Sequence, residues 1–202
     1  MMLQPLTQTV LYLLENRMAL PRENFTVQGF GFMRLRVSPD VRLHVWDARL
    51  RIAGVSDVHD HAQWAFNSII LSGSVVNIRF NVLDPSCMEP NAKLFTERTI
   101  KCGIGGGITE VPTRTVRLQE QRLELHTAGQ QYKQEPEEVH RTNPVDGTVS
   151  IITQFRRDTD TARVFYPHGT EWVDAIPRAA TLDEINDVGG LALKMMKAEV
   201  AA

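Results

Sequence analysis

The sequence predicts an all-β protein, a barrel or sandwich of short strands with a short helix at each end. Three observations favour this class. Many short runs alternate apolar with polar residues, turn-forming residues separate most of these runs, and no helical pattern lies between them. Parallel strands would need long crossovers, usually helical, so an antiparallel arrangement is predicted.

The first element is an amphipathic helix within residues 1–20. Apolar residues recur at helical spacing from Leu3 to Leu14, and Pro21 closes the segment. The helix therefore has one apolar face.

The strands are expected within residues 28–170. Residues 30–37 and 41–46 alternate apolar with polar side chains on either side of Ser38-Pro-Asp, so they form a predicted hairpin. Further runs rich in strand-forming residues cover 68–82, 93–101, 115–125, 147–155 and 162–166. Gly, Pro, Asn or Asp residues lie between most of them, as is typical of turns.

The last element is a helix or tail over residues 181–202. Thr181-Leu-Asp-Glu184 has the pattern of a capping box, in which the threonine and glutamate side chains each bond a backbone N–H of the other. Gly189-Gly190 predicts a break in this helix, because glycine has a low helix propensity. The remaining tail is then available to pack on another subunit.

Composition narrows the function. The 202 residues fit one domain, and a net charge of −2 without a basic stripe argues against nucleic-acid or membrane partners. No apolar run reaches the roughly 20 residues that span a bilayer, and no signal sequence is recognised, so a cytoplasmic location is expected. Cys87 and Cys102 are expected to be reduced thiols. The glycine-rich segment Gly103–Gly107 lacks the features of a phosphate loop and predicts a hairpin tip.

Two histidines at strand spacing are the strongest indication of chemistry. His59 and His61 are two residues apart, so on an extended strand their rings point to the same side. A barrel brings distant strands together around its interior, and His140 can supply a third imidazole. These three residues are the predicted metal ligands. The alternative is a metal-free barrel in which the histidines are structural.

The surroundings of these histidines resemble the two signature motifs of the cupin superfamily. The matching residues are Gly54, His59, His61 and Gly73 in the first motif and Gly129, Pro136, His140 and Asn143 in the second. The resemblance covers residues 28–170 and implies a double-stranded β-helix, the jelly-roll barrel. It also implies a divalent metal on the three histidines, with Fe(II) expected first and Zn, Mn or Ni as alternatives.

Within that superfamily, the chain resembles the branch of cysteine dioxygenase and other thiol dioxygenases. Cupins usually carry a glutamate three or four residues after the second histidine, but Ala65 and Phe66 stand at the corresponding positions here. By this resemblance Arg34 lies where those enzymes hold the substrate carboxylate, a task that suits a guanidinium fork. Thr153 and Phe155 replace the histidine and tyrosine of that branch, which argues against cysteine as the substrate. The chain is also similar to small bacterial and phage cupins.

Several other side chains are candidates for the site. Tyr132 can aim its hydroxyl at a metal-bound ligand, or it is a buried tyrosine with a backbone partner. Glu138 can act as a fourth metal ligand or move a proton. Alternatively, it is solvated or supports a metal ligand without binding the metal itself. Trp64, Phe66 and Phe155 are expected to contact substrate or to be core residues. The remaining histidines, His44, His126 and His168, are expected to be ordinary strand, surface or turn residues.

The sequence thus predicts a metal-dependent enzyme with a small-molecule substrate. The first hypothesis is an iron dioxygenase that acts on a small anionic substrate and dioxygen. The alternatives are a non-redox metal enzyme, such as an isomerase or hydrolase, and a non-catalytic ligand-binding protein. A homodimer is expected, with the amino-terminal strand edge and the last helix as candidate contact surfaces.

Overall fold

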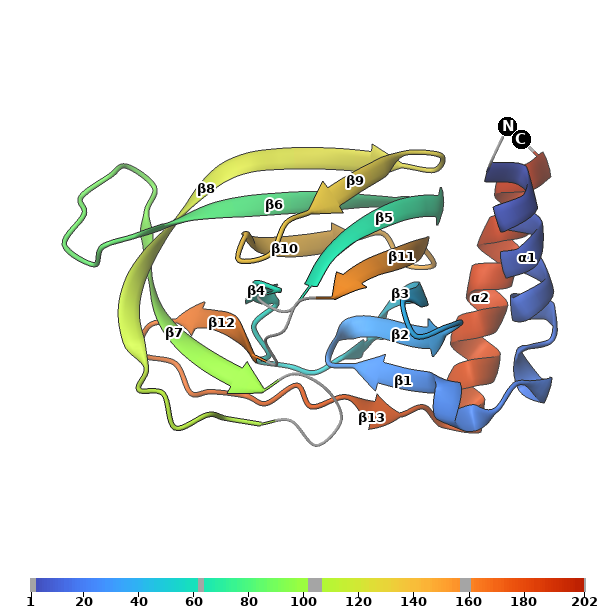
Figure 1. Cartoon of the computed structure of the whole chain (residues 1–202), viewed down its shortest axis with the longest axis horizontal. Coiled ribbons are helices and arrows are strands. Elements are labelled where there is room, and N and C mark those ends of the chain that lie inside the picture. Colours follow the sequence, from blue (N-terminus) through green and yellow to red (C-terminus); the bar gives the residue numbers. More distant parts are fainter. Residues whose placement is uncertain (1–2, 62–63, 102–106, 157–160, 202) are drawn as a thin grey trace.

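A computed structural model of the chain describes residues 3–61, 64–101, 107–156 and 161–201. It contains a closed antiparallel barrel of six strands, a second sheet of seven strands and a helix near each end (Figure 1). This architecture confirms the predicted all-β jelly-roll class. The segment Gly103–Gly107 and Cys102 lie largely outside the described residues.

The seven-stranded sheet has the order β13-β1-β2-β3-β11-β5-β9. Its strands are β1 (Phe25–Gln28), β2 (Phe30–Arg36), β3 (Val41–Arg51), β5 (Trp64–Ser72), β9 (Gln131–Gln134), β11 (Val149–Arg156) and β13 (Arg178–Ala179). The predicted hairpin of β2 and β3 is confirmed, while β1 and β13 extend the sheet beyond the expected limits of 28 and 170.

The barrel has the order β10-β4-β12-β7-β8-β6. Its strands are β4 (Val58–His59), β6 (Ser74–Leu83), β7 (Lys93–Lys101), β8 (Arg114–Thr127), β10 (Val139–Pro144) and β12 (Thr161–Pro167). The run predicted over 68–82 is two strands, because the chain turns at Gly73, where φ is 75°. A Cβ at this position would overlap Thr148, so both the backbone angle and the packing require glycine.

The helices lie side by side at one end of the molecule (Figure 1). Helix α1 spans Leu3–Glu15, two 3₁₀ turns follow at Arg17–Ala19 and Arg22–Asn24, and α2 spans Leu182–Ala201. Among the described residues, neither helix combines the length and apolar character that crossing a bilayer requires.

The amino end of α2 is capped as predicted, but the predicted break inside it is wrong. The Thr181 hydroxyl accepts a hydrogen bond from the Glu184 N–H at 3.1 Å, and the Glu184 carboxylate accepts one from the Thr181 N–H at 2.8 Å. The helix then continues through Gly189 and Gly190. A Cβ on Gly189 would overlap the side chain of Arg17, which crosses the helix there and bonds the backbone of Asn186. The glycine thus allows a close approach rather than ending the helix.

The two faces of the seven-stranded sheet have different neighbours. On the outer face, Met33, Leu43 and Val45 are buried in one cluster with residues of both helices, such as Leu14 of α1 and Val188 of α2. Because side chains alternate along a strand, the residues between them point the other way. The inner face of this sheet therefore forms one wall of an interior cavity.

Candidate metal centre

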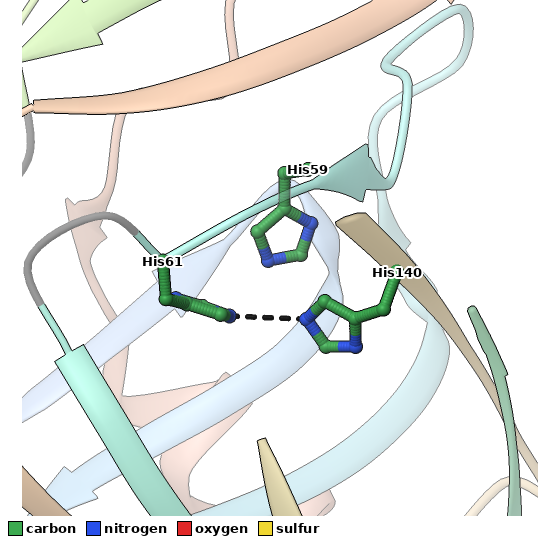
Figure 2. A group of neighbouring side chains, drawn as sticks. All are labelled: His59, His61 and His140. Carbon is green, nitrogen blue, oxygen red and sulfur yellow. Dashed lines mark hydrogen bonds between the residues drawn. The ribbon is translucent and has the colours of Figure 1, made fainter. Parts of the chain in front are cut away.

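Three imidazoles converge inside the barrel (Figure 2). His59 lies on β4, His61 follows it closely in the chain, and His140 comes from β10, where it pairs in register with His59. One ring nitrogen from each residue lies within 4.8 Å of the others. The predicted convergence of these three side chains is confirmed, and together they can hold a metal ion.

Hydrogen bonds fix the tautomer of His59. Its Nδ1 lies 2.8 Å from the backbone carbonyl of Asp57, and because a carbonyl only accepts, Nδ1 carries the proton and donates. The Nε2 lone pair of His59 is then available to a ligand. A backbone carbonyl behind a histidine in this way is a common support for metal-binding imidazoles.

A chain of buried amides does the same for His140. Its Nδ1 lies 2.8 Å from Asn77 Oδ1, Asn77 Nδ2 lies 3.4 Å from Gln134 Oε1, and Gln134 Nε2 lies 3.3 Å from the Glu138 carboxylate. A carboxylate only accepts, so it orients the Gln134 amide, which orients that of Asn77. Asn77 therefore presents its oxygen to His140, whose Nδ1 donates and whose Nε2 is free.

This chain places Glu138 behind the ligands and outside the histidine cluster. Its carboxylate lies 2.6 Å from Arg79 and also accepts the Glu135 N–H at 2.8 Å. The cluster of potential metal ligands in the described residues consists of the three histidines alone. Glu138 is therefore not placed as a fourth ligand, and its position matches the alternative of a residue that supports a ligand from behind.

The geometry and charge of the cluster fit a divalent transition metal. His61 Nε2 lies 3.1 Å from His140 Nε2, the separation of about 3 Å expected for two nitrogens that each lie about 2.0–2.1 Å from one metal. Burial lowers the pKa of all three histidines, those of His61 and His140 well below the ordinary value. The rings are thus neutral near pH 7, and the neutral form is the one that binds metals.

A cavity of about 410 Å³ opens over this cluster. Arg34, Trp64, Phe66 and Tyr132 line it, as predicted. Phe155 does not, and its prediction as a contact residue is corrected: its side chain is 49% exposed and lies outside the lining. Side chains alternate along β11, so the lining position belongs to its neighbour Gln154.

Two acids beside the histidines are neutralised by arginines. The Asp57 carboxylate lies 2.6 Å from Arg51, and the Asp60 carboxylate, which is fully buried, lies 2.6 Å from Arg163. Although they contribute to the cavity wall, neither brings an unpaired negative charge to it.

Tyr132 is held in the wall by aromatic packing. Its ring stacks on His126 with 4.5 Å between centroids and meets Phe66 edge-on at 6.3 Å. Burial raises the pKa of Tyr132, and the hydroxyls of Ser68 and Thr142 offset part of that rise. The phenol is therefore protonated at neutral pH.

Two polar residues of the cavity wall, Arg42 and His44, were not predicted from the sequence to line it. Both alternate on β3 with Leu43 and Val45, which face the helices. The His44 ring stacks on Phe32 at 4.4 Å, and burial, together with nearby arginines, lowers its pKa well below the ordinary value. The apolar residues at the alternate positions, Leu43 and Val45, could have indicated this, because they show which face of β3 packs against the helices and which faces the cavity.

A comparison with protein-family models found no match, and a comparison with curated protein sequences found none either. The site is therefore interpreted from its own residues: a three-histidine cluster in a β-barrel, compatible with a metal-binding cupin.

Proposed function

We propose that the chain is a cupin-type metalloenzyme, a non-heme Fe(II) dioxygenase that acts on a small anionic substrate. The observation that supports this most is the composition of the cluster. Three neutral imidazoles, with no carboxylate in the cluster among the described residues, would leave the full double charge of a divalent metal facing the cavity. Such a site favours a negatively charged donor from the substrate.

Ferrous iron held by His59, His61 and His140 would supply open coordination positions and the chemistry of dioxygen activation. Nickel, manganese and zinc accept similar ligands, so the metal itself has to be measured.

The protein residues bind and orient the substrate in this proposal. Arg34 holds a carboxylate: its Nε already donates to the Thr26 hydroxyl at 2.9 Å, which fixes the side chain and leaves its terminal nitrogens for a ligand. Trp64 and Phe66 exclude water from the bound molecule. Tyr132 can hold or deliver a proton through its hydroxyl, because burial keeps it protonated.

The first test is metal analysis of protein purified without chelator, followed by oxygen uptake with a panel of small carboxylate-bearing thiols and diketones. Iron with substrate-dependent oxygen uptake supports the proposal. Zinc without uptake contradicts it and favours an isomerase or hydrolase, and absence of metal favours a non-catalytic binding protein.

The second test removes one ligand. We expect His140→Ala to abolish stoichiometric metal binding while the barrel remains folded, because two imidazoles bind far more weakly than three. His168→Ala is the matched control, since His168 lies in a turn outside the cavity. Full metal occupancy in His140→Ala, measured by elemental analysis alongside circular dichroism, would contradict the assigned triad.

A further inference from the structure

Two arginines of the cavity wall have no carboxylate partner among the described residues. Arg34 and Arg42 both line the cavity, and neither forms an ion pair there. Arg42 lies over the Trp64 ring, with its guanidinium carbon 5.4 Å from the ring centroid. Partly buried guanidinium groups normally find an anionic partner, so these two point to a ligand.

None of the three acids that line the cavity pairs with these arginines. Asp57 and Asp60 are already paired with Arg51 and Arg163, and the third, Asp174, is exposed. Among the described residues, the wall around Arg34 and Arg42 is therefore positively charged before any metal is considered.

Lys101 and Asp174 also line the cavity, but both are exposed and their charges are opposite in sign. The excess positive charge of the partly buried wall consequently comes from Arg34 and Arg42. Burial and the charges of Arg34 and Arg36 lower the pKa of Arg42 to about 10, against a smaller opposing effect of Asp40, so Arg42 still carries its proton at neutral pH.

The same wall contains buried polar atoms without a hydrogen-bond partner in the described structure. They are Gln28 Nε2, His44 Nε2, Trp46 Nε1 and Gln154 Oε1, and all four residues line the cavity. A buried polar atom left unpaired costs about 1–3 kcal/mol, which a bound polar group would recover. Two of the four, Gln28 Nε2 and Trp46 Nε1, only donate, and donors suit a negatively charged oxygen.

The contacts of the two side chains draw them toward opposite sides of the β2–β3 pair. In the register, Arg34 of β2 lies opposite His44 of β3, and Arg42 lies two residues before His44 on the same strand. Arg34 is tied to Thr26 of β1, whereas Arg42 lies over the Trp64 ring of β5, and these two strands lie on opposite sides of β2 and β3 in the sheet. Two separately anchored guanidinium groups suit two anionic groups on one small molecule better than a single anionic centre.

We propose that the cavity selects a small dicarboxylate, with one carboxylate on Arg34 and the second on Arg42. The inference rests on the proposed function only for calling this molecule the substrate. Binding of the dicarboxylate depends on the two arginines of the cavity wall and does not require a metal.

The test compares succinate with butyrate, which has the same chain length and one charge fewer, by calorimetric titration of the full-length chain. We expect succinate to bind at least about tenfold more tightly than butyrate, as loss of one charged hydrogen-bonded pair implies. Arg42→Gln should remove this preference. Arg36→Gln is the matched control: Arg36 pairs in register with Arg42 but is exposed and outside the lining, so the preference should persist.

Repeating the titration on His140→Ala separates this inference from the proposed function. A succinate preference that survives in His140→Ala supports the dicarboxylate site whether or not iron chemistry is found. Equal binding of succinate and butyrate by the folded wild-type chain would overturn it, as would an equal loss in Arg36→Gln and Arg42→Gln. If inorganic phosphate binds more tightly than succinate, the cavity prefers a single anionic group, and the proposal of two separate carboxylates is overturned. Circular dichroism confirms that each variant is folded.

Discussion

The two faces of the sheet formed by β2, β3 and β11 have opposite characters although they share one backbone. The outer face carries Leu43, Val45 and Ile151 against the helices, all buried and apolar. The inner face carries Arg34 and His44, with unpaired polar atoms beside them. A single strand thus contributes alternately to the stability of the fold and to a binding site.

This difference between the two faces shows how a small barrel can retain a cavity. An interior that only had to be stable would be filled with apolar side chains at crystal-like density. Here the outer face and the helices provide that packing, so the inner face can retain polar groups at a cost in free energy. Three predictions test this division.

The largest effect is expected from truncating one residue on each face of β3. Leu43 is fully buried, so Leu43→Ala should reduce the free energy of unfolding by about 2–5 kcal/mol. His44→Ala should cost markedly less, because its ring nitrogen Nε2 has no hydrogen-bond partner to lose. Urea denaturation measures both variants, and equal losses would show that the two faces do not differ in this way.

A smaller effect is expected behind the metal ligands. Asn77→Ala removes the acceptor that orients His140 and should weaken metal binding about 10–100-fold, the range seen when such supporting groups are removed.

Asn81→Ala on the same strand is the control, since among the described residues the hydrogen bond to His140 comes from Asn77 and Asn81 forms none with a histidine. Metal titration by competition with a chelator provides the comparison. If Asn77→Ala and Asn81→Ala bind metal equally well, the amide chain has no role in orienting the ligand.

The smallest effect concerns the helix that covers the outer face. The hydrogen bond from Arg178 holds the pKa of Glu184 at about 2, below its ordinary value of 4.5. The unfolded chain therefore binds more protons in this range, and the stabilisation present above pH 4.5 is lost as the pH falls toward 2. Because Arg178 is half exposed, we expect a loss of only about 1 kcal/mol.

Unfolding free energies of wild type and Glu184→Gln between pH 2 and 6 check this, over a range that extends from the lowered pKa to above the ordinary one. The difference between the two proteins should shrink as the pH falls. A difference that stays constant with pH would mean that the contact with Arg178 does not lower the pKa of Glu184.

Local patterns predicted most of the long elements. The β2–β3 hairpin, the run of β7 and the capping box of α2 each depend on residues near one another in the chain, so they could be recognised there. The short strands β1 and β13 were not predicted. β13 has two residues and exists because Arg178 and Ala179 pair with β1, more than 150 positions earlier.

The features of the metal centre and its cavity also divide into those that the sequence revealed and those that required the tertiary structure. Residue identity and spacing were enough to select His59, His61 and His140 and to show that no glutamate follows them at the usual place, because these are properties of the chain as written. Whether a polar side chain is paired or free depends on neighbours that arrive from distant strands. The support of Asn77 for His140, and the position of Arg42 in the cavity wall without an ion pair to any described residue, therefore became visible only once the strands were packed together.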